Sequence, residues 1–392
     1  MTESMPPPLP SPRRVAPEAG RPRLAALDGL RFLAAMAVLA YHYVAVNHSA
    51  WGAPTDESFP HLQPVVAFGS FGVQLFFVIS GFVILMSAWG RNVTSFTASR
   101  VGRLFPAYWF SVAAVVALLV LVAPGRKDVG VAETAANLTM VQRAFGVQDI
   151  EPVYWTLWTE LRFYVLIGLL LAIGMTRNRL VAFAAVWPVL AAIAVRTDSE
   201  LWSTLLVGSD APLFAGGMML YLLTKERRSL VLWLVLGLNV ALAGVVSGRS
   251  QSLRIANSTD VTIGPETYWA AILACFALVA LVSLTRIDRL SWKWLTLVGA
   301  LTYPLYLLHS SWGQWLIAQW YPHLPAWATF TLVTAAVLGV AYLVHRFVER
   351  PLGPRLRRAV AHDLERTSRY LGRKPQEVRD ARAPEPEPVS TR

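Results

Sequence analysis

Ten apolar runs follow one another along this chain, and they restrict its fold more than any other feature. They lie at about 31–47, 69–88, 105–123, 154–174, 180–195, 210–223, 230–246, 267–284, 294–312 and 327–346. A straight helix needs roughly 20 apolar residues to cross the hydrocarbon core of a bilayer. The chain is also 55% hydrophobic and only 15% charged, far from the average of soluble proteins. The sequence therefore predicts an all-α polytopic membrane protein with about ten transmembrane helices.

The basic residues between these runs predict the orientation. Cytoplasmic loops hold an excess of Lys and Arg, and such residues occur before the first run and after the second, fourth, sixth, eighth and tenth. The loop at 247–266 fits least well, because it holds Arg249 and Arg254 on the expected outer side. We expect both termini in the cytoplasm. The net charge of +11 then reflects topology, and no nucleic-acid partner is expected.

The two ends of the chain differ in composition from the apolar part. Residues 1–26 are rich in proline and are expected to form a disordered cytoplasmic arm, and 373–392 a disordered tail. Between them, 27–351 form the predicted transmembrane domain. Leucine and valine recur at helical spacing in 352–372 opposite many arginines. This segment is predicted to be an amphipathic helix, which either lies on the anionic inner leaflet or is solvated.

A few ionisable residues lie where a bilayer would surround them. Each is a candidate functional residue, since a charge there is energetically expensive. They are His42, Glu160 and His309, with Arg31 at the foot of the first helix. At 1.5 Å per residue, His42 and His309 lie roughly 16 Å and 22 Å above the inner face, and Glu160 lies roughly 9 Å below the outer face. Counting therefore predicts that these three groups share the outer half of the membrane.

Arg100 and Arg103 are expected beside Arg31 at the inner face. An imidazole with a carboxylate partner can take a proton from a hydroxyl, whereas arginines can hold phosphates. His42 lies eleven positions after Arg31, which is about 1100° of helical rotation, so both are expected on one side of the helix. Cys275 is the only cysteine, and the chain lacks the HExxH and CxxC motifs. No metal is therefore expected.

Each of these residues also has a structural interpretation. An intramembrane histidine can form a hydrogen bond between helices, and Glu160 can pair with Arg162. Arg31 and Arg103 can be topology anchors. Ser80 in the stretch FFVISGF is a candidate nucleophile, but beside a glycine it fits close helix packing better.

Six stretches between about 27 and 351 form a recognisable series. They are LDGLRFLAAMAVLAYH, FGSFGVQLFFVISGFVI, FTASRVGRLFPAYW, WTLWTELRFYVL, YPLYLLHSS and VERP. Together they resemble the acyltransferase-3 family of bacterial integral-membrane acyltransferases. They occur in the family's order, which makes the resemblance specific.

The resemblance implies an enzyme of the bacterial inner membrane that moves an acyl group, acetyl above all, from acyl-CoA to a hydroxyl of a carbohydrate, glycolipid or macrolide. It implies that His42 is the catalytic residue and that Arg31 and Arg103 lie near the donor. Arg100 belongs to the same basic motif and is expected to bind the donor. Glu160 and His309 are catalytic candidates mainly because of their predicted depth. The short tail resembles that of stand-alone members, without an added domain.

Two other classes of function remain open at this point. A proton-coupled exporter could use His42, Glu160 and His309 as a proton relay, although no internal repeat typical of exporters is visible. A membrane scaffold would tolerate replacement of every intramembrane ionisable residue.

Overall fold

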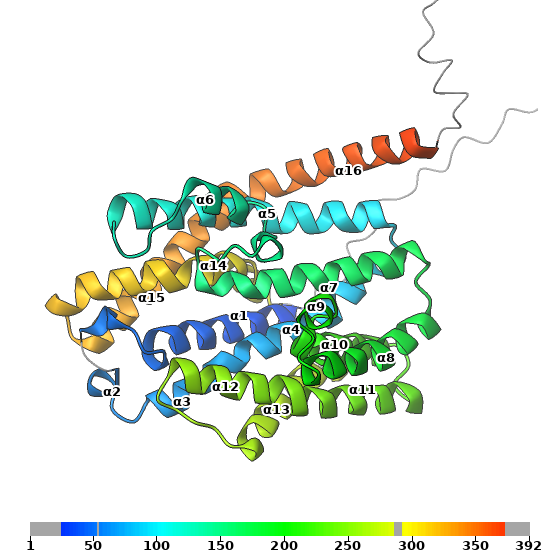
Figure 1. The fold of residues 1–392 in the computed structure, drawn as a ribbon, viewed down its shortest axis with the longest axis horizontal. Coiled ribbons are helices and arrows are strands. Elements are labelled where there is room, and N and C mark those ends of the chain that lie inside the picture. The colour runs from blue at the N-terminus through cyan, green and yellow to red at the C-terminus, as the bar shows by residue number, and fades with distance from the viewer. Residues whose placement is uncertain (1–24, 53–54, 286–291, 373–392) are drawn as a thin grey trace, which may run out of the picture.

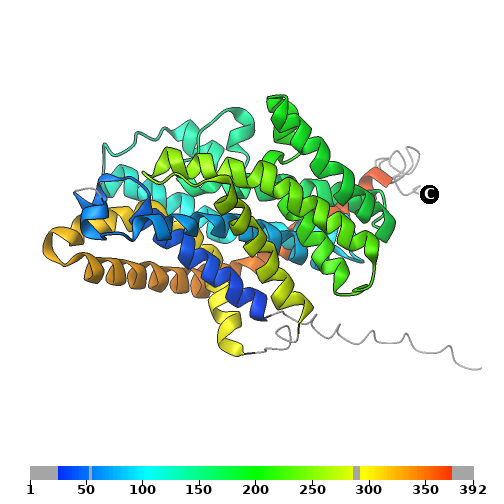
Figure 2. The ribbon, with the colours of Figure 1, turned by 90° about the horizontal axis from the view of Figure 1, so that it is seen from below.

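The computed structural model describes residues 25–52, 55–285 and 292–372, which form helices and no strand. Most helices run roughly along the long axis of the bundle (Figures 1 and 2). The predicted tail at 373–392 and all but the last two residues of the predicted arm at 1–26 lie outside the described residues. Those two residues, Ala25 and Ala26, are already helical.

Eight helical segments of the described part are long and apolar enough to cross a membrane. In chain order they are α1 (Ala25–Ala40) with the π-helical turn η1 (Tyr41–Ala45); α3 (Gln63–Ala67), η3 (Phe68–Phe71) and α4 (Gly72–Ala88); α5 (Val93–Ala117) with η4 (Leu118–Val122); η6 (Pro152–Tyr154) with α7 (Trp155–Ala172); α8 (Arg177–Arg196); α11 (Leu230–Leu242), η8 (Ala243–Gly248) and α12 (Arg249–Ser258); α13 (Pro265–Leu284); and α15 (Ala326–Val344), η11 (His345–Glu349) and α16 (Arg350–Gly372).

The other two predicted runs are helices that do not meet both criteria. Helix α10 (Ala211–Leu223) has 13 residues, about 20 Å of helix, which is shorter than the hydrocarbon core. Nearly all of its side chains are buried among neighbouring helices. Helix α14 (Lys293–Trp320) is long enough at 28 residues, but it carries polar residues such as Thr302 and His309.

Short helices connect these segments. They are η2 (Ser49–Trp51), α2 (Thr55–Ser58), α6 (Val131–Asn137), η5 (Gln142–Phe145), α9 (Glu200–Leu205), η7 (Gly208–Asp210) and η10 (Tyr321–His323).

Helices α4 and α10 pack backbone to backbone at the centre of the bundle. A Cβ atom on Gly81 would collide with the carbonyl oxygen of Phe214, and one on Gly217 with that of Val78. Small residues at such crossings let membrane helices approach closely where no hydrophobic effect drives them together. This explains the glycine beside Ser80 and supports the packing interpretation of that stretch.

Helices α1 and α14 lie side by side and run in the same direction. Near their starts Gly299 lies against Asp28, and near their ends the hydroxyl of Tyr43 donates to the carbonyl oxygen of His309 at 2.9 Å. We call the end of the bundle where both helices begin the arginine end, and the opposite end the histidine end. The registration of these two helices places the candidate residues of one against those of the other.

Candidate active site

Two histidines from η1 and α14 meet near the histidine end. His42 Nδ1 lies 3.2 Å from His309 Nε2, and the ring centroids are 5.0 Å apart. His309 is 1% exposed, whereas His42 is partly exposed. His42 lies in the π-helical turn η1, a backbone form that occurs often at functional sites. The structure thus brings together two of the three titratable residues expected in this half of the bundle.

The hydrogen bonds of the pair define its neutral tautomers. His309 Nδ1 lies 2.8 Å from the carbonyl oxygen of Tyr306, and His42 Nδ1 lies 2.9 Å from that of Val38. Because a carbonyl oxygen only accepts, both Nδ1 atoms carry the proton. His42 Nδ1–H is then shared between the carbonyl oxygen of Val38 and His309 Nε2, and His42 Nε2 keeps its lone pair. Within the described residues no hydrogen-bond partner contacts that atom. This is the arrangement of an oriented general base.

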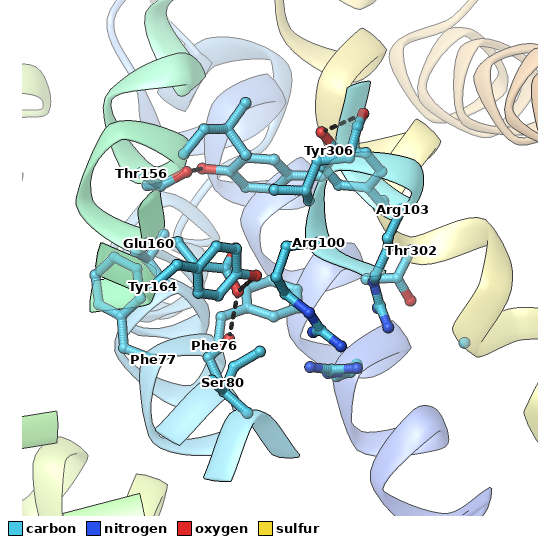
Figure 3. Close-up of a pocket in the computed structure, with 17 residues that line it drawn as sticks. Phe76, Phe77, Ser80, Arg100, Arg103, Thr156, Glu160, Tyr164, Thr302 and Tyr306 are labelled. Atoms are coloured by element: carbon cyan, nitrogen blue, oxygen red, sulfur yellow. Dashed lines mark hydrogen bonds between the residues drawn. The ribbon is translucent and has the colours of Figure 1, made fainter. Parts of the chain in front are cut away.

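A narrow cavity of about 90 Å³ lies between this pair and the arginine end. Its charged wall residues are Arg31, Arg100, Arg103 and Glu160. Figure 3 shows Glu160 on α7 and the two arginines of α5 around the same space. The ring of Tyr306 also lines the cavity, and it lies 5.6 Å from the ring of His309. Tyr306 therefore separates the cavity from the histidine pair.

The expected grouping of Glu160 with the histidines is not found. Its Oε1 accepts from Tyr164 at 2.6 Å and from Ser80 at 3.0 Å (Figure 3). It also interacts electrostatically with Arg31 and Arg100. Residue counting gives the depth of a side chain but not the direction in which it points. The face of α7 that carries Glu160 is turned toward the arginines, so the carboxylate lies in a positively charged environment.

The three arginines form a positive cluster in which Glu160 is the carboxylate that lines the same cavity, so positive charge is in excess among the described residues. Among the described residues none of them is in an ion pair. Arg100 lies 5.8 Å from the ring centroid of Tyr164, and its buried Nε atom has no hydrogen-bond partner in the part of the chain that the structure describes. Buried donors of this kind need an acceptor. The cluster therefore fits an anionic ligand such as a phosphate.

Sequence reasoning missed a buried carboxylate near the histidine pair. Glu151, immediately before η6, is fully buried, and its Oε1 accepts from the backbone N–H of Ser311 at 3.3 Å. Its other oxygen has no hydrogen-bond partner within 25–52, 55–285 and 292–372. Burial raises the pKa of this carboxyl to about 7. The only signal in the sequence was an acidic residue at the border of an apolar run, which is common in loops.

Arg254, which fitted the expected orientation poorly, stacks on an aromatic ring. Its guanidinium carbon lies 3.8 Å from the ring centroid of Trp155. A cation over an indole face is attracted by the ring's quadrupole. This contact gives Arg254 a structural reason to lie at the histidine end.

Comparisons with known proteins identify the family. The family profile described as "Acyltransferase domain" matches residues 24–346. Nodulation protein 10 from Rhizobium leguminosarum bv. viciae is 27% identical over 356 residues, which is 83% of this chain and 92% of that protein. No solved structure matches the chain. The apolar helices and this match together indicate a multi-pass membrane protein. Because the profile covers most of its length, the chain belongs to the acyltransferase-3 family and is an acyltransferase that moves groups other than amino-acyl groups.

Proposed function

We propose that this protein is an O-acyltransferase of the bacterial inner membrane, with both termini in the cytoplasm. It transfers an acyl group, acetyl in the first instance, from acyl-CoA to a hydroxyl of a carbohydrate, glycolipid or macrolide. The observation that carries the proposal is His42 Nε2, which has no hydrogen-bond partner among the described residues and is oriented by the contacts of Nδ1–H with Val38 and His309. The family match does not favour the exporter.

The histidine pair has the chemistry for acyl transfer. His42 Nε2 takes the proton of the acceptor hydroxyl while that oxygen attacks the thioester carbonyl. His309 Nε2 accepts from His42 Nδ1–H throughout, which stabilises the imidazolium that forms. The C–S bond then breaks, and the proton on His42 passes to the leaving thiolate. The products are an ester and free CoA, and no metal is needed. Such general-base assistance is worth roughly 10²-fold to 10⁴-fold in rate.

The arginine cluster supports a donor that arrives from the arginine end. Arg31, Arg100 and Arg103 line the cavity with a single carboxylate among them. In this proposal they attract the phosphates of acyl-CoA, and the pantetheine arm extends past Tyr306 toward His42. Glu160 balances part of the positive charge and holds Tyr164 in place. Its role is electrostatic, and it does not act on the acceptor proton.

The proposal is tested with purified protein in nanodiscs. Acetyl-CoA labelled in its acetyl group is added with a pool of glycosides and macrolides, and the label is followed into the pool by mass spectrometry. The expected result is label on a hydroxyl-bearing acceptor, with one free CoA released for each ester formed. Uptake of unmodified glycosides into sealed vesicles without any acyl-CoA, and no label transfer, would overturn the proposal.

A further inference from the structure

A second and much larger cavity opens at the arginine end. Its volume is about 1020 Å³, and its wall is formed by α1, α4, α5, α14, η11 and α16. Four residues line both this cavity and the narrow one, namely Arg31, Arg103, Gly299 and Tyr303. The two spaces therefore meet at a common wall. A ligand with a bulky charged head and a thin arm would fit this pair of spaces.

The wall of the larger cavity is strongly basic. Among the described residues, five arginines line it, and the carboxylates that do so are Asp28 and Glu349. Glu349 is already engaged, because its Oε2 lies 2.7 Å from Nδ1 of His345. Three of the five arginines come from the C-terminal helix: Arg350, Arg357 and Arg358. Within the described residues none of these three is in an ion pair. Their charge is available to a ligand.

Helix α16 packs closely against α5 at Gly102. A Cβ atom on Gly102 would lie 2.7 Å from the carbonyl oxygen of Gly353 and 2.7 Å from Cβ of Arg357. Only glycine allows the two backbones to approach this closely. Figure 1 shows α16 alongside α5 at one edge of the bundle. Gly102 is the neighbour of Arg103, so this contact brings Arg357 to the arginine cluster.

We propose that α16 completes the nucleotide site of the donor, with Arg350, Arg357 and Arg358 binding the phosphates of the 3′-phospho-ADP group of acyl-CoA. The inference rests on the proposed function, because it takes acyl-CoA as the donor. The large basic cavity holds the nucleotide, the shared wall with Arg31 and Arg103 marks the start of the arm, and the narrow cavity leads the arm toward the histidines. Arginine suits this role because its guanidinium binds phosphate oxygens in pairs.

The competing occupant is a phospholipid headgroup, which offers the same phosphate chemistry. The nucleotide is favoured because the cavity shares its wall with the space that leads to Glu160 and Tyr306. A headgroup would require only the outer surface of α16. The nucleotide and the headgroup are distinguished by measuring the binding of 3′,5′-ADP in two kinds of nanodisc. One kind contains neutral lipid alone, and the other also contains anionic phospholipid.

The test compares wild type, the double variant Arg357→Ala/Arg358→Ala and the control Arg355→Ala. Arg355 lies on the same helix, is exposed and does not line the cavity. Binding of 3′,5′-ADP is measured by calorimetry, and KM is measured for acetyl-CoA and for S-acetylpantetheine, which lacks the nucleotide. We expect the double variant to bind 3′,5′-ADP about 10-fold to 100-fold more weakly in both lipids, as for lost charge-assisted hydrogen bonds. The KM of the double variant for acetyl-CoA should rise by a similar factor, whereas its KM for S-acetylpantetheine should stay unchanged. Arg355→Ala should resemble wild type in both measurements.

Three results would overturn this inference. They are unchanged binding of 3′,5′-ADP in the double variant, an equal loss with both donors, and an effect seen only with anionic lipid. The failure of the proposed function looks different. In that case wild type transfers no acetyl group from either donor, whereas the binding of 3′,5′-ADP still reports on the arginines of α16.

Discussion

His42 Nδ1 and His309 Nε2 lie 3.2 Å apart although the two residues are 267 positions apart in the chain. The contact joins η1 to α14. His309 thus occupies the position beside His42 that a carboxylate occupies beside the catalytic histidine of many hydrolases. Unlike a carboxylate, it brings no negative charge. The partner is fixed in turn by the carbonyl oxygen of Tyr306.

His309 is therefore expected to act as a positioning residue. We predict that His309→Ala lowers kcat roughly 10-fold to 100-fold, less than the loss of the base itself. The KM for acyl-CoA should change little, because His309 does not line the cavity. His309→Gln should recover part of the rate, since its amide oxygen can still accept from His42 Nδ1–H. The measurement is steady-state CoA release, with elution in size-exclusion chromatography as a check of folding. Equal activity of the Ala and Gln variants would contradict this role.

Glu160 is predicted to act on donor binding through its charge. Glu160→Gln retains acceptors for Ser80 and Tyr164 but removes the negative charge near the arginines. The anionic donor should then bind more tightly, with KM for acyl-CoA lower by about fivefold, which corresponds to roughly 1 kcal/mol. Kinetics at low salt would show this best. A 100-fold loss of kcat at constant KM would place Glu160 in proton transfer instead.

Glu151 is predicted to make stability depend on pH. Burial raises its pKa in the folded protein from 4.5 to about 7, so folding favours the protonated form. The contribution is fully present below pH 4.5 and is lost as pH rises to 7, by roughly 3 kcal/mol in all. In Glu151→Gln this loss should be absent. Melting temperatures of both proteins between pH 4.5 and 8 check it, and a constant difference across that range would be inconsistent with the prediction.

Gly102 is predicted to control the docking of α16. A leucine there collides with Gly353 and Arg357, so α16 should move away and the KM for acyl-CoA should rise several-fold. Gly168 in α7 is a matched control, because a Cβ atom there meets no atom within 4 Å. Gly168→Leu should behave as wild type in the same assay. If Gly102→Leu had no effect on the KM, α16 would have no part in donor binding.

The periodic features of the sequence predicted much of the fold. Apolar runs of sufficient length predicted an all-helical membrane protein, and all ten runs are helical. The length of its apolar run could not predict that α10 is surrounded by other helices. Its central position depends on the glycines at its crossing with α4. The apolar run at 294–312 predicted most of α14 but not its continuation to Trp320.

The sequence predicted those parts of the site that depend only on the depth of a residue along its helix. The three arginines share one cavity and the two histidines meet, as their depths suggested. Depth could not reveal that Glu160 faces the arginines, because the rotation of α7 is determined by its neighbours. The basic residues of α16 were predicted to lie on a membrane surface or in water. Their place on a cavity wall depends on a glycine contact between helices about 250 residues apart.

The central claim is that His42 is the base for acyl transfer. It is tested most directly by the release of free CoA from acetyl-CoA in the presence of an acceptor, compared between wild type and His42→Ala in matched nanodiscs. We predict acceptor-dependent release by wild type and a rate lower by at least about 10²-fold in the variant, with the same binding of 3′,5′-ADP in both. Full activity of His42→Ala, with the acceptor acylated as in wild type, would contradict the claim.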